Sequence, residues 1–415
     1  MPAAAGAGLR GHAVPARHAI RLFVRQQALP PIAAEARGRV LRPIHEREGV
    51  GALVSGQCGA GRASGFAMVP PAAAAETQAR EGLAVPASET RTRLVDIDTA
   101  KGIGIVLVVL GHVVSQQVPA GHDWYQQLKT AIYLFHMPFF MYLSGYVLGY
   151  AGFGKREGAA EFIARRADRL LLPFFAFGLI IIAGKVVFSQ IVHVDNTQDS
   201  LLAYLDGLFI HTSRSPATSV WYLYAAFVYA LLFRFVVVPF PRLLPALIAI
   251  GLVLTQAEVE SLLYADRVLR HAAFFFIGVW VGMRREAMAE LLARHGWLIL
   301  AAFAAALALA QVLAAPLLGL AVALLSIPAL HFAATRLAAA GDPVFLFFGR
   351  YTMAIYLFNT ICIGLVKGFG FVVVKWDGNA FYAYFIVLTL AGLFLPVLIR
   401  RVVERVTPRL ARYIT

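Results

Sequence analysis

The sequence predicts an all-α, polytopic membrane protein, a helix bundle with about ten transmembrane helices. Three observations predict it: 60% of the 415 residues are hydrophobic, only 14% are charged, and the mean hydropathy is +0.71. Soluble domains are about 45–50% apolar and about 25% charged. A chain of this length could bury a large core, but it has too few charges to cover a soluble surface. Lipid must therefore cover much of it.

The apolar segments set the number of expected spans. A helix needs about 20 mostly apolar residues to cross a bilayer. The fifth and sixth candidates are short and could be tilted or re-entrant. We expect spans at roughly 102–120, 130–152, 170–193, 218–239, 243–258, 268–283, 297–314, 316–334, 344–366 and 380–400.

The basic residues predict the orientation of these spans. The net charge is +14, and most of the Lys and Arg residues fall in alternate loops. The positive-inside rule then places both termini in the cytoplasm. Membrane lipid is the expected partner around the bundle. In a soluble protein such an excess would suggest nucleic acid, but topology is the simpler cause here, so no nucleic-acid partner is expected.

The N-terminal residues 1–90 differ from the rest. They are rich in Ala, Gly, Pro and Arg and contain no apolar run of spanning length. A disordered tail, a targeting peptide and a mis-assigned start, with initiation near Met68 or later, are the three interpretations, and the tail is preferred. We expect residues 1–67 to be dispensable, residues 91–405 to form the transmembrane domain, and residues 406–415 to form a cytoplasmic tail.

The first span carries an unusual set of polar residues. Lys101 and His112 are eleven residues apart, which is almost three turns and about 16 Å along a helix, so they share one face. Asp98 lies one turn before Lys101 and could pair with it, while Ser115 and Gln116 would extend the polar stripe. A cation at the inner mouth suits a phosphate, and a deeper histidine suits proton transfer. Alternatively, Lys101 is only a topology charge and His112 a packing residue.

Five segments, in order, resemble the acyltransferase family 3 membrane proteins. The spacing of Lys101 and His112 matches their signature of Arg or Lys, ten residues, then His, in a form similar to the fucose 4-O-acetylase branch. The other four segments are 135–146, 166–173, 221–223 and 349–357. The pattern departs at Asn359, where many relatives have His, so no catalytic role is carried over to that position.

The resemblance implies an enzyme that transfers an acyl group, with acetyl preferred, from acyl-CoA to a hydroxyl of a cell-surface or secreted carbohydrate. Its location would be the plasma membrane, in bacteria the inner membrane. His112 is then the expected general base, with Lys101, Asp98 and His136 as further catalytic candidates. The donor's phosphates would be bound by basic residues, since Arg grips phosphate through a planar fork: Lys101, Arg166, Arg169 and Arg350.

Other residues have weaker assignments. His136 precedes Pro138, which frees the carbonyl of Leu134, so that His112, His136 and this carbonyl could form a polar pocket. Arg270 and His271 could bind the acceptor, although packing is the simpler role. Lys185 lies within the third span without an evident role.

Two other classes of protein stay open. Ten spans with intramembrane charge also fit a secondary transporter of a sugar or polyol, and a non-catalytic relative would not need His112. No metal is expected, because the sequence has neither an H-E-x-x-H motif nor a Cys cluster. The sequence does not indicate the oligomeric state.

Overall fold

A computed structural model describes residues 94–114, 118–151, 158–190, 194, 197–217, 219–313 and 315–414. Within these ranges the chain is helical, and its β-structure is limited to an isolated bridge between His211 and Leu262. The fold class expected from the sequence is therefore confirmed. The predicted tail, residues 1–90, lies outside the described ranges.

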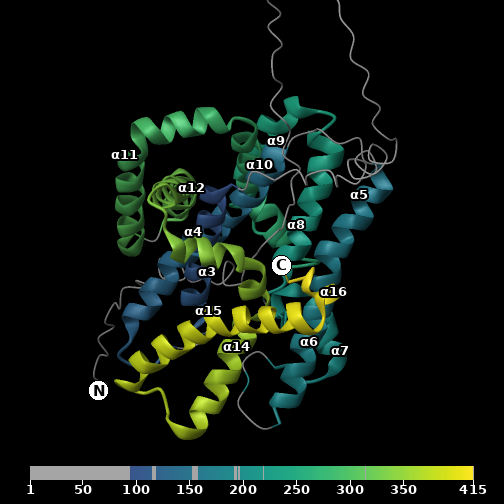
Figure 1. The fold of residues 1–415 in the computed structure, drawn as a ribbon, viewed down its shortest axis with the longest axis vertical. Helices are drawn as coiled ribbons and strands as arrows, with labels where there is room; N and C mark the ends of the chain where they lie inside the picture. Colours follow the sequence, from purple (N-terminus) through teal and green to yellow (C-terminus); the bar gives the residue numbers. More distant parts are fainter. Residues whose placement is uncertain are drawn as a thin grey trace, which may run out of the picture. The chain divides into compact units, whose positions relative to one another are not determined.

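The helices follow the predicted order (Figure 1). Two segments are π-helices, η1 and η3, and two are short 3-10 helices, η2 and η4. The elements are α3 (Val95–His112), α4 (Asp123–Ala151), α5 (Ala159–Arg166), η1 (Ala167–Leu171), α6 (Leu172–Phe188), α7 (Leu201–Phe209), η2 (Thr212–Arg214), α8 (Trp221–Leu232), η3 (Phe233–Val237), η4 (Pro241–Leu243), α9 (Leu244–Leu254), α10 (Ala265–Met283), α11 (Arg285–Val312), α12 (Pro316–Ala339), α13 (Pro343–Arg350), α14 (Thr352–Val373), α15 (Ala380–Val406) and α16 (Pro408–Ala411).

The number of spans follows from length and composition. Six helices among the described residues are long and apolar enough to cross a membrane: α4, α5 to α6, α11, α12, α14 and α15. A seventh candidate is the pair α8–η3 and η4–α9, which is bent by 118°. The predicted total of ten is thus not confirmed, although each predicted segment contains a helix.

Three helices from predicted spans, α3, α9 and α10, are not candidate membrane-crossing helices by themselves, for physical reasons. Each of α3 and α10 carries three charged side chains within fewer than 20 residues, and such groups are costly in lipid unless they face the bundle interior. Both helices are largely buried by their neighbours. The 11 residues of α9 are too few to span the bilayer, as the short fifth candidate suggested.

The chain beyond α9 nevertheless returns to the level of the loop before α8. The amide of Thr212 donates to the carbonyl of Ser261 at 2.8 Å, and the amide of Leu263 donates to the carbonyl of Ile210 at 2.9 Å. These bonds fix the start of α10 next to the segment that precedes α8. The non-helical residues 255–264 therefore complete the path that α9 begins.

Helices α4 and α10 pack tightly and in parallel, through paired glycines. Gly145 and Gly149 of α4 face Gly278 and Gly282 of α10, and a Cβ added at any of the four would lie about 2 Å from a backbone carbonyl oxygen of the other helix. Two G-x-x-x-G repeats thus let the backbones touch, as is common between membrane helices. Parallel packing agrees with the predicted topology, in which both spans run inward.

The predicted ninth span differs from the observed helix. Residues 343–350 form the separate short helix α13, and the long helix α14 starts only at Thr352. Tyr351 interrupts the helical geometry with φ −105° and ψ 10°, and the hydroxyl of Thr352 donates to the Gly349 carbonyl at 2.8 Å. The span therefore begins about two turns later than its apolar residues suggested.

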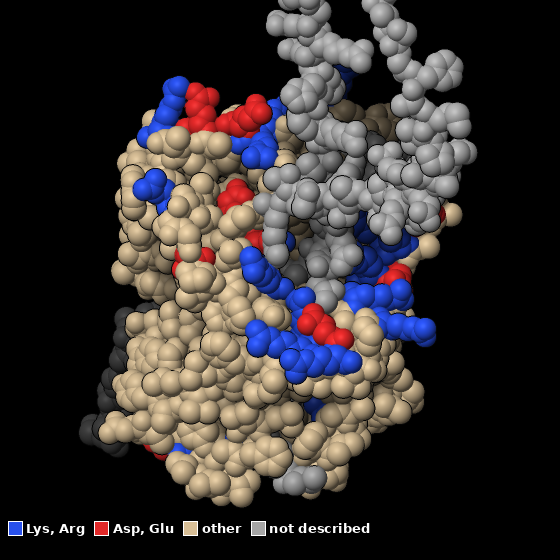
Figure 2. Space-filling model, viewed as in Figure 1, with Lys and Arg blue, Asp and Glu red and all other residues tan. Residues whose placement is uncertain are grey.

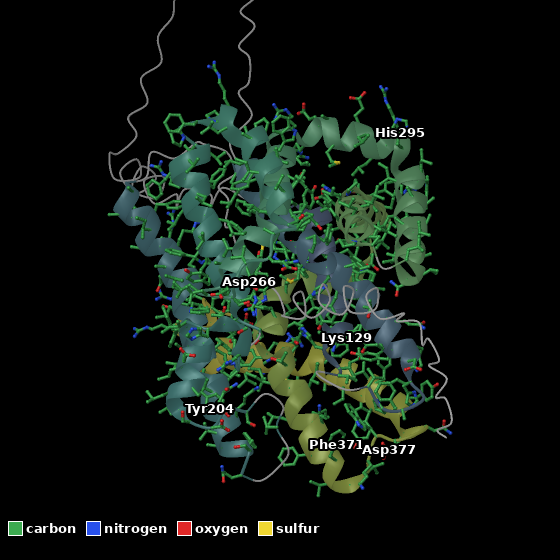
Figure 3. The ribbon with its side chains drawn as sticks, turned by 180° about the vertical axis from the view of Figure 1, so that it is seen from behind. Lys129, Tyr204, Asp266, His295, Phe371 and Asp377 are labelled. Carbon is green, nitrogen blue, oxygen red and sulfur yellow. The ribbon has the colours of Figure 1, made fainter. Side chains whose placement is uncertain are left out.

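Figure 3 shows His295 near one end of the molecule and Asp377 near the other, with Lys129 and Asp266 at intermediate levels. The orientation of the helices in the membrane stays a prediction.

Candidate active site

His112 is the last residue of α3, and its imidazole faces α14. Its Nδ1 lies 3.1 Å from Oδ1 of Asn359. Asn359 is completely buried. Asn359 is thus a site residue to which the sequence analysis gave no catalytic role. Its position two residues after Leu357, where many relatives have His, was the available signal.

The contacts of Asn359 fix the proton on His112. The side-chain NH2 of Asn359 donates to the carbonyls of Ile355 and Tyr356 at 2.8 and 2.9 Å. Its oxygen must then face His112, and an amide oxygen only accepts. Nδ1 of His112 therefore carries the proton in the neutral ring, and Nε2 keeps a lone pair. A general base needs that lone pair.

The end of α3 is held by side chains of α4 that the sequence analysis did not single out. The last carbonyls of a helix have no partner within it. Here the hydroxyl of Tyr125 donates to the Leu110 carbonyl at 2.9 Å, the hydroxyl of Tyr133 donates to the Gly111 carbonyl at 3.2 Å, and Nζ of Lys129 donates to the Val114 carbonyl at 2.7 Å. These bonds position the backbone on both sides of His112.

The spacing of these residues was a usable signal. Tyr125, Lys129 and Tyr133 recur every four residues and so share one face of α4. The structure buries Lys129 in α4, at 6% exposure. A buried ammonium near the C-terminal end of α3 is favourable, because that end of a helix carries partial negative charge.

His136 lies on α4 close to His112, as expected. The ring of Tyr133 separates them, with its centroid 6.4 Å from that of His112 and 4.8 Å from that of His136. Nδ1 of His136 donates to the Ile132 carbonyl at 2.8 Å, and the expected pocket with the carbonyl of Leu134 stays a prediction. α4 runs unbroken through Pro138.

The inner end of α3 brings Lys101, Asp98 and Arg350 into one region. Nζ of Lys101 donates to Oδ1 of Asp98 at 3.1 Å, the pairing expected from their spacing. α13 lies directly on this turn, and a Cβ on Gly349 would be 1.8 Å from the Asp98 carbonyl oxygen. The carbonyl of Arg350, the next residue, accepts from Arg400 at 2.7 Å. Lys101 and His112 share one unbroken helix, so the predicted separation of about 16 Å holds.

Arg166 and Arg169, expected to bind the donor's phosphates, lie in two consecutive helical segments. Arg166 ends α5, and Arg169 belongs to the π-helix η1. Pro173 cannot donate to the Arg169 carbonyl, four residues earlier, and this favours the wider turn. Asp168 accepts from Tyr413 at 2.9 Å, which ties η1 to the C-terminal tail. Within the described ranges no hydrogen bond joins either arginine to Lys101.

A basic surface lies over α5, α16 and the C-terminal end of α15, where Figure 2 shows Lys and Arg side chains gathered. Its exposed members are Arg165, Arg401, Arg405, Arg409 and Arg412. Among the described residues, no group of three or more His, Cys, Asp or Glu side chains could hold a metal ion.

The fold and these contacts define a class: a polytopic helical membrane protein whose first helix joins a lysine–aspartate pair near one end to a histidine within the bundle. The chain belongs to the acyltransferase 3 family, whose sequence profile, described as an acyltransferase domain, matches residues 94–401. The family predicted from the five motifs is therefore confirmed, and with it the class of membrane acyltransferases.

Curated relatives cover only part of the chain. It is 32% identical over 158 residues to nodulation protein NolL of Mesorhizobium japonicum, covering 37% of this chain and 38% of that protein. It is 30% identical over 163 residues to nodulation protein NolL of Sinorhizobium fredii, covering 39% of each. The aligned part thus spans about two fifths of these relatives. No solved structure matches the chain.

Proposed function

We propose that this protein transfers an acetyl group from acetyl-CoA to a hydroxyl of a cell-surface or secreted carbohydrate, in the plasma membrane, which in bacteria is the inner membrane. The observation that carries the proposal is the bond between His112 and Asn359, because it leaves an unprotonated Nε2, with its lone pair, on a histidine inside the bundle. Membership of the acyltransferase family supports the reaction type.

The proposed step has one base and balances without a metal. Nε2 of His112 takes the proton of the acceptor hydroxyl while the hydroxyl oxygen attacks the thioester carbonyl carbon. The new C–O bond forms, the C–S bond breaks, and the proton passes from His112 to the leaving thiolate. The positive charge on the ring is transient, and the Oδ1 of Asn359 is well placed to stabilise it.

The donor is proposed to enter from the end of the bundle that holds Lys101. Its phosphates would meet Lys101, Arg166, Arg169 and Arg350, and the basic surface over α5, α15 and α16 would attract them. The separation of about 16 Å between Lys101 and His112 along α3 resembles the length of an extended pantetheine arm. Asp98 orients Lys101 through their ion pair.

The test uses the purified full-length chain in detergent with acetyl-CoA and a mixture of carbohydrate acceptors. Release of free CoA that depends on the acceptor is the expected result, and His112→Ala should abolish it. The matched control is His211→Ala, an exposed histidine paired with Asp206. A sugar or polyol transporter would release no CoA without a sealed membrane, and equal rates for native protein and His112→Ala would exclude the proposed base.

The domain boundaries are part of the same proposal. Residues 91–405 would form the catalytic unit, which agrees with the family match to residues 94–401. We propose that residues 1–67 are dispensable. Loss of acetyl transfer by a correctly inserted protein that lacks residues 1–67 would refute this.

A further inference from the structure

A second set of polar side chains lies at the start of α10 and on the facing start of α8. Trp221, Arg267 and His271 are each at least 98% buried, and Asp266 is 93% buried. Each keeps at least one buried polar atom that no hydrogen bond satisfies within the described residues: Nε1 of Trp221, Oδ1 of Asp266, Nε and Nη1 of Arg267, and Nε2 of His271. Leaving such groups buried and unpaired is energetically costly.

These side chains form one cluster, which we call the α10 cluster: Trp221, Asp266, Arg267 and His271. The rings of Trp221 and His271 have centroids 5.2 Å apart. The guanidinium of Arg267 lies 5.9 Å from the Trp221 ring and 3.8 Å from a carboxylate oxygen of Asp266. Neither contact satisfies the unpaired N–H groups.

The backbone that carries the cluster is held in a costly conformation. Leu263 and Tyr264, directly before α10, both have positive φ, 50° and 60°, which non-glycine residues rarely adopt. The amide of Tyr264 donates to the Thr212 hydroxyl at 3.2 Å, and Nη2 of Arg267 donates to the Thr212 carbonyl at 3.0 Å. The loop before α8 therefore fixes the direction in which α10 starts.

His136 belongs to the same region. Because α4 and α10 run in parallel through their paired glycines, with Gly145 facing Phe275 and Gly278 facing Tyr142, His136 and His271 lie within about one helical turn of the same level. Nδ1 of His271 donates to the Arg267 carbonyl at 2.8 Å, just as Nδ1 of His136 donates to Ile132. Both rings thus keep a buried Nε2 lone pair without a donor in the described chain.

The chemistry of the unpaired atoms indicates what would satisfy them. Two imidazole nitrogens and a carboxylate oxygen need donors, whereas an indole N–H and two guanidinium N–H groups need acceptors. A hydroxyl both donates and accepts, and an aromatic ring can pack against the apolar face of a sugar. The charges of Asp266 and Arg267 offset each other, so the cluster has no net charge that would require a charged ligand. We propose that the α10 cluster, together with His136, binds a neutral polyhydroxylated compound, a sugar ring without a carboxylate or phosphate.

This inference rests on the proposed function and deepens it, because the bound ring would be the acyl acceptor. The ring of Tyr133 lies between His112 and His136, so a sugar bound at His136 would be one aromatic ring away from the proposed base. The subsite would select the acceptor, while His112 would act on the hydroxyl presented to it.

Binding can be measured without turnover. The probes are methyl glycosides of neutral hexoses and deoxyhexoses, and the reference compounds are methyl glycosides of uronic acids. Thermal unfolding of the full-length protein in detergent is followed with each compound, for the native protein and for His112→Ala. We expect the neutral glycosides to raise the unfolding temperature of both proteins.

Two conservative variants test the cluster itself. Trp221→Phe keeps an aromatic ring and removes the N–H, and His271→Gln keeps a polar group of similar reach. Each should weaken sugar binding about tenfold, the effect of losing one well-placed hydrogen bond to a buried group. The matched control is Trp280→Phe, at the other end of α10 against Arg284, which should bind as the native protein does.

The outcomes separate this inference from the proposed function. If the native protein binds sugar but transfers no acyl group, the proposed function is contradicted and the sugar subsite is supported. Acyl transfer to sugars with unchanged sugar affinity in both cluster variants would overturn the subsite and keep the function. Tighter binding of the uronic acid glycosides, or lower stability of both variants without any change in affinity, would also overturn it.

Discussion

His112 and Asn359 lie 3.1 Å apart although 247 residues separate them in the sequence. The amide is held by two carbonyls of α14 and therefore cannot rotate without losing both bonds. His112 thus receives its orientation from a helix near the end of the chain, and its basic nitrogen is directed by that contact. Asn359 is a positioning residue in this arrangement, because it acts on the reaction through His112.

Asn359→Leu should lower kcat about 100-fold with little change in the KM for acetyl-CoA. An isosteric apolar side chain leaves the His112 ring without an acceptor, so that both tautomers and several orientations are populated. Asn359→Asp keeps an acceptor oxygen and should retain more activity than Asn359→Leu. The measurement is the rate of CoA release in detergent over a range of acetyl-CoA concentrations.

Cys362→Ala is the control for this change, because Cys362 lies one turn further on the same helix and is also buried. It should keep nearly the native kcat. Native activity in Asn359→Leu would show that His112 does not depend on the amide.

Lys101→Gln should raise the KM for acetyl-CoA about tenfold and leave kcat within about threefold of native. Loss of one charge-assisted bond to phosphate costs about 1.5 kcal/mol, and 1.4 kcal/mol corresponds to a factor of ten. Lys101→Arg should keep a low KM, because it retains the charge. Initial rates at varied acetyl-CoA concentration provide the measurement.

Lys375→Gln removes an exposed positive charge outside this site, and its KM should equal that of the native protein. The donor assignment would be lost if Lys101→Gln changed only kcat, since the residue would then act at the reacting atoms and not on the donor's phosphates.

Gly145→Ala should destabilise the protein strongly. The added methyl group would lie 1.9 Å from the carbonyl oxygen of Phe275, which is backbone and cannot move aside. α4 and α10 would have to separate along their glycine contact, and we expect a cost of several kcal/mol, in the range of overpacked cores. The readout is the unfolding temperature in detergent.

Gly364→Ala supplies the matched control on α14, where an added Cβ meets nothing within 4 Å. It should be neutral or stabilising by up to about 1 kcal/mol, because alanine favours helix more than glycine does. Equal unfolding temperatures for Gly145→Ala and Gly364→Ala would contradict the close packing of α4 on α10.

Single cysteines should report opposite sides of the membrane for the two ends of the bundle. In a Cys58→Ser, Cys362→Ala background, which has no native cysteine, Asp377→Cys should react with a membrane-impermeant thiol reagent applied to intact cells. His295→Cys should react only after permeabilisation, because His295 is exposed on the basic N-terminal part of α11, which is expected in the cytoplasm. Figure 3 places the two residues at opposite ends. Labelling of both from outside would exclude the predicted orientation.

The sequence by itself determined the class of fold, the family and the first helix. Composition requires lipid around the chain, and a spacing of eleven residues places Lys101 and His112 on one face of any straight helix. These properties are local, so they do not depend on which helices pack against each other. The pairing of Asp98 with Lys101 belongs to the same group, since both lie within one turn.

Only the tertiary structure decided which distant residues meet. Nothing in the local sequence brings Asn359 to His112, Lys129 to the end of α3, or Trp221 to His271, because each pair depends on how closely separate helices approach. That approach is set by glycines such as Gly145, Gly278 and Gly349, whose missing side chains let backbones touch. The interruption at Tyr351 and the bend after η3 are likewise consequences of packing and connection, which hydropathy averaged along the chain does not register.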